Sequence, residues 1–176
     1  MADKKQYPIG KPSFSEDYSQ EDLDQWIDDI ALLPEHIRNE IKGCSDDVLL
    51  TPYRENGWTV RQVISHLLDS HLNTIVRIKT ALTEDNPTIR PYNQDGWVQV
   101  DFQFEIPLEL TLDMLENTHE MMVRIYQSLN ENQWERTFTN PESGITFTLA
   151  RSAAHYAWHS NHHLAHIRLV TQQEKS

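Results

Sequence analysis

Five of the chain's nine histidines fall within twelve residues, in the stretch HYAWHSNHHLAH from His155 to His166. Imidazole rings four residues apart on a helix share a face and can bind one metal ion. Three pairs have this spacing, at positions 155/159, 159/163 and 162/166, so spacing alone does not choose among them. A polar helix face rich in histidine also occurs without a metal. The stretch therefore predicts either a metal site or a solvated surface.

A metal gripped by two histidines of one helix needs a further ligand from elsewhere, because two ligands alone bind weakly. The remaining histidines are His36, His66, His71 and His119. Periodicity favours His71, which falls in the middle of an apolar stripe. However, a lone histidine on an apolar face is usually a core residue with a hydrogen-bond partner. The residue pattern leaves the choice between His66 and His71 open, with His119 less favoured.

Two helices are expected in the first half of the chain. The first begins at Ser19 and ends near Gly43, and Pro34 is expected to kink it or divide it. The second begins after Thr59, which forms a capping box with Gln62, and runs to about residue 82. Apolar residues recur every three or four positions in both segments, which is typical of helices that bury one face.

Residues 84–107 contain three prolines and read as a long irregular loop. A third helix is predicted from Leu108 to about Leu129, followed by a short hairpin around an Asn-Pro-Glu-Ser-Gly turn. The last helix is predicted from Leu149 to about Gln172, with Thr148 as its cap. Four helices without a substantial sheet predict an all-α, up-and-down four-helix bundle with a kinked first helix and long loops.

The chain has 176 residues and is expected to form one bundle domain, residues 19–176, preceded by an extended N-terminal arm, residues 1–18. Its net charge of −12 disfavours nucleic acid and anionic membranes as partners. No apolar run approaches the roughly 20 residues of a spanning helix, and no signal peptide is evident. The single cysteine, Cys44, excludes an internal disulfide and fits a reducing compartment, so a cytoplasmic location is expected.

The segments GWTVRQVISHLLDSH and WHSNHHLAHI together resemble the YfiT-like branch of the DinB superfamily. The segments YPIG, TPYR and RPY, and the lengths between them, resemble the same branch, so the resemblance covers nearly the whole chain. It implies a DinB-like four-helix bundle with one divalent metal ion per chain. It also implies a homodimer.

The resemblance implies the ligands His66, His159 and His163, because these positions match the family's histidine pattern. His155, His162 and His166 flank them and are candidates for orienting ligands or moving protons, although they could equally be polar neighbours. Further candidates for the surroundings of the metal or the wall of the pocket are Asp69, Ser70, Arg90, Tyr92 and Trp97, with Tyr53 and Arg54 in the preceding loop.

Three neutral histidines with an open position are typical of a catalytic metal site, and zinc or nickel suits them, as iron also could. Such a metal lowers the pKa of bound water or holds a thiol as thiolate. The resemblance implies a metal-dependent hydrolase acting on a small molecule. The alternative is a thiol S-transferase that uses bacillithiol or a similar low-molecular-weight thiol. A metal-binding stress protein without catalytic activity is a further alternative.

Overall fold

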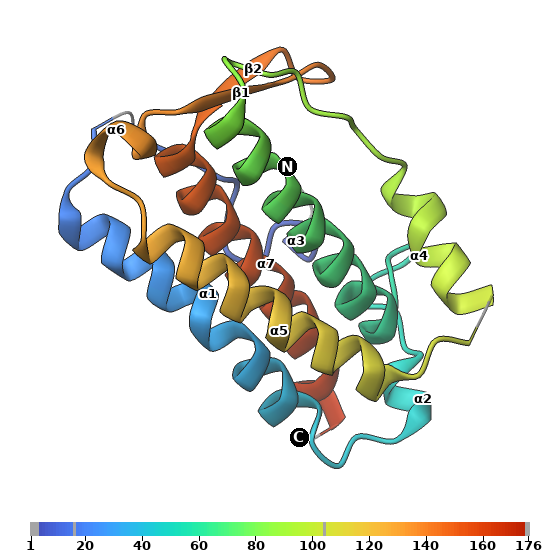
Figure 1. Ribbon diagram of the computed structural model, residues 1–176. Helices are drawn as coiled ribbons and strands as arrows, with labels where there is room; N and C mark the ends of the chain where they lie inside the picture. Colours follow the sequence, from blue (N-terminus) through green and yellow to red (C-terminus); the bar gives the residue numbers. More distant parts are fainter. Residues whose placement is uncertain (1–3, 16, 104, 175–176) are drawn as a thin grey trace.

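The computed structural model describes residues 4–15, 17–103 and 105–174. Four long helices form a bundle, as Figure 1 shows. They are α1 (Gln20–Ile41), α3 (Val60–Thr83), α5 (Leu108–Gln127) and α7 (Leu149–Glu174). The predicted all-α four-helix class is confirmed. Within the described ranges, no helix is both long and apolar enough to cross a membrane.

The ends of the long helices follow local capping signals. Ser19 and Asp22 form a capping box at the start of α1, and Thr59 and Gln62 form another at the start of α3. The hydroxyl of Thr148 accepts a hydrogen bond from the backbone N–H of Arg151, 3.0 Å away, at the start of α7. These caps satisfy backbone donors that have no partner within the helix. Because each cap depends on residues only a few positions apart, the sequence alone predicts where these helices begin.

The order of the helices around the bundle differs from a simple up-and-down arrangement. Each of α1 and α3 packs against both α5 and α7, so the consecutive pairs α1/α3 and α5/α7 lie on the diagonals. Asn161 of α7 bonds Asp29 of α1, and farther along both helices Arg168 bonds Glu40, so α1 and α7 run parallel. The helices α3 and α5 are likewise parallel, because Arg61 lies near the start of α5 and His71 bonds His119.

The connection between α3 and α5 explains the long segment 84–107. Two parallel helices joined in sequence need a link that returns along the whole bundle. Part of this link forms a helix, α4 (Gln94–Gln103), which packs against α3. The expected irregular loop is therefore wrong over these ten residues. Among its described side chains only Val98 is buried, so α4 lacks the apolar periodicity that reveals a helix.

Short elements close the ends of the bundle. Two of them are single turns of helix, α2 (Asp46–Leu49) and α6 (Glu131–Trp134). The predicted hairpin is present as β1 (Thr137–Asn140) and β2 (Ile145–Thr148), paired antiparallel with Phe138 opposite Phe147. Gly144 has a positive φ of 67° in its turn, a conformation that favours glycine. The hairpin lies at the end of the bundle where α3 ends and α7 begins (Figure 1).

The core is divided into two apolar clusters along the bundle axis. One contains Ile27, Ile78 and Tyr126 toward the hairpin end, and the other contains Leu67 and Leu115 toward the α2 end. Between them lies a buried polar layer to which α3, α5 and α7 contribute. Its buried members are His66, Ser70, His71, Thr74, Thr118, His119, His159, Ser160 and His163. The histidines therefore lie in the middle of the bundle instead of on a solvated face.

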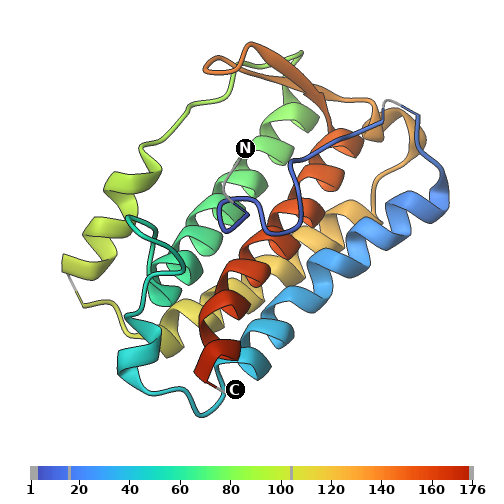
Figure 2. The same ribbon diagram turned by 180° about the vertical axis from the view of Figure 1, so that it is seen from behind.

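In its described residues, 4–15 and 17–18, the N-terminal arm has no regular helix or strand, but it is not separate from the bundle. Figure 2 shows this segment, in dark blue, crossing α7. The backbone carbonyl of Gln6 accepts a hydrogen bond from His166, and Phe14 lies edge-on to His155, with ring centroids 5.7 Å apart. The arm therefore packs on α7, a contact that the sequence did not indicate. Its apolar side chains are too sparse for a periodic pattern, yet they cover the histidine-rich helix.

Candidate metal centre

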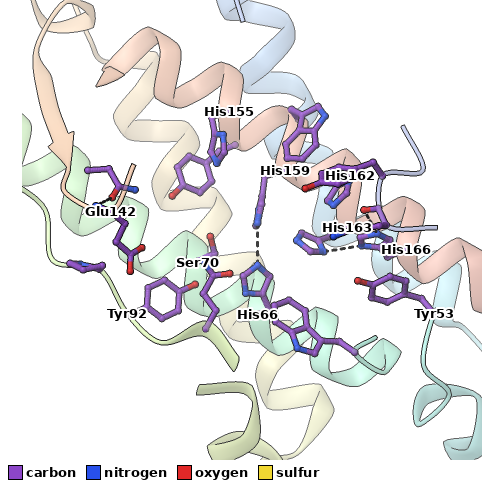
Figure 3. A pocket seen from close by; sticks show the side chains of 18 of the residues that line it. Tyr53, His66, Ser70, Tyr92, Glu142, His155, His159, His162, His163 and His166 are labelled. Atoms are coloured by element: carbon purple, nitrogen blue, oxygen red, sulfur yellow. Dashed lines mark hydrogen bonds between the residues drawn. The ribbon is translucent and has the colours of Figure 1, made fainter. Parts of the chain in front are cut away.

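Three imidazole rings converge from two antiparallel helices in the buried polar layer. His66 comes from α3, and His159 and His163 come from successive turns of α7. One ring nitrogen of each lies within 4.8 Å of the others, and all three side chains are buried. In Figure 3 the three rings point toward one another. This group could hold a metal ion.

The spacing of two of these nitrogens fits a common ion. Nε2 of His66 lies 3.2 Å from Nε2 of His159. Two histidine nitrogens bound tetrahedrally to zinc at about 2.0–2.1 Å lie about 3.3 Å apart. The nitrogens of His66 and His159 therefore already lie close to the separation that a shared ion requires.

Burial keeps these rings in the neutral form. It lowers the pKa of His66 from 6.5 to about 4, helped by His162 and His166. It also lowers the pKa values of His159 and His163 well below 6.5, with neighbouring histidines adding to the effect. A positive charge is costly in an apolar surrounding and beside other rings that would carry the same charge. Neutral imidazole is the form that donates a lone pair to a metal.

A second group of rings adjoins the first and shares His163 with it. Nitrogens of His162, His163 and His166 also lie within 4.8 Å of one another. Nδ1 of His166 is 3.3 Å from Nδ1 of His163, and Nε2 of His166 donates to the carbonyl of Gln6, also at 3.3 Å. The ring of His162 stacks on Trp158, with centroids 4.5 Å apart. The overlapping pairs thus divide: 159/163 faces α3, whereas 162/166 faces the N-terminal arm.

The other two central histidines do not face the gap between the three rings. Nε2 of His71 lies 3.1 Å from Nδ1 of His159, and Nδ1 of His71 lies 2.6 Å from Nε2 of His119. Nδ1 of His119 donates to the carbonyl of Ile30 at 2.6 Å. Helical periodicity placed His71 in the core, and this is confirmed. His36 lies outside the cluster and is partly exposed.

A cavity of about 460 Å³ opens in front of the three rings. This volume lies in the usual range for small-molecule sites. Its walls are largely aromatic and include Tyr7, Tyr53, Trp58, Tyr156 and Trp158. The ring of Trp58 covers His66, with centroids 4.6 Å apart, and its indole N–H donates to Asp95 of α4. The aromatic rings thus stand directly beside the histidines of the cavity.

The remaining predicted pocket residues fall into two groups. Ser70, Tyr92, Tyr53 and Arg54 line the cavity, as do the flanking histidines His155, His162 and His166. Trp97 packs behind Tyr92, with ring centroids 4.6 Å apart, and Arg90 is exposed; neither lines the cavity.

Asp69 also lies outside the cavity, on the side of α3 that faces α4. Burial and the nearby Asp101 raise its pKa from 3.8 to about 7. The proximity of Asp69 and Asp101 was not evident from the sequence, because Asp101 lies in the segment expected to be irregular.

Arg77 and Tyr156 are cavity residues that the sequence did not indicate. Nη1 of Arg77 donates to the hydroxyl of Tyr156 at 2.7 Å. Arg77 follows His66 and Ser70 on the same face of α3, a spacing that could have revealed it once His66 was chosen. Among the described residues, no carboxylate forms an ion pair with Arg77 or with Arg54. The cavity wall therefore holds two arginines that form no ion pair among the described residues, together with one carboxylate, Glu142, in a chain of net charge −12.

Comparison with known proteins gives a consistent result. A family model described as "DinB superfamily" matches residues 20–167. A Bacillus cereus protein named "Putative metal-dependent hydrolase" is 44% identical over 161 residues, which cover 92% of each chain. A relative from Oceanobacillus iheyensis, of the same description, is 39% identical and covers 96% of each chain.

The fold also matches a solved structure. It superposes on YfiT from Bacillus subtilis with a TM-score of 0.93 and 35% sequence identity, over 98% of both chains. That protein is described as "a probable metal-dependent hydrolase with an unusual four-helix bundle topology".

Proposed function

The chain belongs to the DinB superfamily, and on this basis we propose that it is a metal-dependent enzyme, a hydrolase of small molecules. One observation carries the proposal: three buried, neutral histidines bring one ring nitrogen each to within 4.8 Å of the others, and all three line one cavity. The relatives are named as putative or probable metal-dependent hydrolases, which supports the same reaction class.

His66, His159 and His163 are the proposed ligands of one divalent ion, zinc or nickel, with iron as a further candidate. When bound with an open coordination position, such an ion lowers the pKa of a water or thiol ligand and polarises the bond that reacts. The protein holds the three rings neutral by burial, and it orients His159 and His163 through hydrogen bonds to His71 and His166.

The walls of the cavity position the substrate in this proposal. The aromatic side chains Trp58, Tyr53 and Trp158 exclude bulk water from the reacting centre. The guanidinium groups of Arg54 and Arg77 provide fixed positive charge, which favours a substrate with a carboxylate or another anionic group. This charge is the feature of the cavity that most narrows the substrate class.

Transfer of a thiol to an electrophile is the second candidate reaction. The same two arginines favour it, because low-molecular-weight thiols such as bacillithiol carry carboxylates. A role in metal storage without catalysis would call for a closed site with a fourth protein ligand. His162 would be the nearest addition, but it stacks on Trp158 and groups with His166 on the side of the arm. An open position facing the cavity therefore supports an enzyme.

The two reactions are separated by one pair of assays on the zinc-loaded and nickel-loaded protein. Ester and amide substrates bearing a carboxylate are supplied without thiol, and bacillithiol is supplied with monochlorobimane as the electrophile. Hydrolysis that needs no thiol and disappears in His159→Ala supports the hydrolase. Conjugation that disappears in the same variant, with no hydrolysis, supports the transferase. His36→Ala, outside the cluster, is the matched control and should retain full activity. If the metal-loaded protein shows neither hydrolysis nor conjugation, the proposal of an enzyme is contradicted.

A further inference from the structure

We propose that His71 and His119 are positioning residues: together they form a hydrogen-bond relay that fixes the tautomer of His159, leaving its Nε2 without hydrogen. The relay runs from the backbone carbonyl of Ile30 through His119 and His71 to His159. The inference rests on the proposed metal site, because it assigns these two residues a task toward that site.

The direction of each hydrogen bond follows from its fixed end. A carbonyl oxygen can only accept, so Nδ1 of His119 must carry the hydrogen that reaches Ile30 at 2.6 Å. A neutral imidazole has one N–H, so Nε2 of His119 is an acceptor and takes the hydrogen from Nδ1 of His71, 2.6 Å away. Nε2 of His71 is then the acceptor for Nδ1–H of His159 at 3.1 Å. The Nε2 atom of His159 is left with a free lone pair directed at the gap.

Pro34 explains why the carbonyl of Ile30 is available within an unbroken helix. In an α-helix this carbonyl would accept from the backbone N–H four residues later, and proline at position 34 has no N–H. The helix α1 continues through Pro34, so the oxygen stays buried and needs another donor. His119 supplies it from α5. The proline thus provides the anchor of the relay.

The surroundings of the relay leave few alternatives for its hydrogens. His71 is 0% exposed and His119 is 1% exposed, between the two apolar clusters of the core. Reversing any one ring would place two donors or two acceptors face to face and leave a buried group without a partner. Such groups are strongly disfavoured inside proteins, so the three tautomers are coupled.

His66 differs from His159 in this respect. Its Nδ1 is buried and has no hydrogen-bond partner in the described part of the chain, so no relay fixes its tautomer. Without an ion, Nε2 of His66 can therefore carry the hydrogen and donate it to Nε2 of His159 at 3.2 Å. When an ion displaces this hydrogen, only His66 has to change its tautomer. His159 already has its hydrogen on Nδ1 and a free lone pair on Nε2.

His163 is oriented by a second, weaker chain of hydrogen bonds. Its Nδ1 faces His166, which donates to the carbonyl of Gln6, and both distances are 3.3 Å. Gln6 is exposed on the N-terminal arm, so water can compete at the end of this chain. The relay through His71 should therefore constrain its ligand more tightly than the one through His166.

The proposal is tested by nitrogen NMR of histidine side chains and by zinc affinity, measured by competition with a chromophoric chelator. In the zinc-free protein we expect His159 as the Nδ1–H tautomer, and a mixture of tautomers in His119→Leu. Zinc affinity should fall about 10–100-fold in His71→Leu, as for other groups that orient metal ligands, and less in His119→Leu. His119→Gln keeps an acceptor for His71 and should restore most of the affinity. His36→Leu is the control and should change neither measurement.

An Nε2–H tautomer of His159 in the zinc-free wild-type protein would overturn the relay, whatever the variants do. Unchanged zinc affinity in His71→Leu and His119→Leu, with circular dichroism showing folded protein, would overturn it as well. Failure of the metal site itself has a different signature, since His159→Ala would then bind zinc as tightly as wild type. The NMR measurement on the wild-type protein needs no metal and separates the two outcomes.

Discussion

Nε2 of His66 lies 3.2 Å from Nε2 of His159, although 93 residues separate them in the chain. Two ring nitrogens this close share either a hydrogen or a metal ion, and the cavity in front of them gives access to the second. The short distance connects His66 of α3 with the pair His159 and His163 of α7. Spacing along the last helix alone could not select that pair.

The first prediction concerns metal content. Alanine in place of His66, His159 or His163 should abolish stoichiometric binding, because two remaining histidines bind an ion weakly. His162→Ala and His36→Ala should retain about one ion per chain. Metal analysis by mass spectrometry after gel filtration gives the result. Full occupancy in any of the first three variants would rule out that residue as a ligand.

The second prediction concerns the stability of the metal-free protein in acid. Burial lowers the pKa of His119 to about 4, below the 6.5 of an unfolded chain, so the unfolded state takes up the proton first as pH falls. The contribution of His119 is therefore present above pH 6.5 and lost between pH 6.5 and about 4. Each such histidine adds a slope of up to about 1.4 kcal/mol per pH unit in this window.

Urea unfolding at several pH values measures this slope. In His119→Gln the slope between pH 4.5 and 6 should decrease by about one proton. His36→Gln provides the comparison, since its side chain is outside the buried layer. A slope that is the same in His119→Gln and the wild type would show that His119 does not titrate in this way.

The third prediction concerns Asp69, whose effect has the opposite sign. Burial and Asp101 raise its pKa to about 7, so its contribution is lost as pH rises from about 4 through 7. Asp69→Asn should stabilise the protein at pH 8 by about 1–2 kcal/mol, after allowance for solvent screening, and have little effect at pH 4. Unfolding midpoints at the two pH values measure the difference. Equal effects at both would contradict the raised pKa.

The fourth prediction concerns substrate charge. Arg77→Gln should raise KM for an anionic substrate about tenfold or more while metal content stays at the wild-type level, because the guanidinium lines the cavity but lies outside the proposed ligand set. A neutral analogue of the same substrate should show little change. Arg124→Gln removes an exposed arginine of α5 that is paired with Glu120, and it should change neither KM for the anionic substrate nor the metal content. Loss of metal in Arg77→Gln would instead indicate a role in maintaining the site.

Local signals explain which parts of the fold were predictable. The capping boxes at Ser19 and Thr59 and the apolar periodicity of the long helices act within a few residues, so the sequence located these helices closely. The helix α4 was not predicted, because only one of its described side chains is buried and its sequence therefore has no apolar periodicity. The packing of the N-terminal arm was not predicted because Gln6 and Phe14 have partners on α7, more than 140 residues away.

By itself, the sequence determined the four helices and the stripe of histidines on the last one, since both depend on periodicity along a single segment. Resemblance to relatives then suggested His66, His159 and His163. Only the tertiary structure decided which part of the stripe faces α3, because that depends on how two distant helices cross. The roles of His71 and His119 were decided in the same way. Each of the two has hydrogen-bond partners on two other helices. The carbonyl that anchors them is available only because Pro34 lies one turn farther along α1.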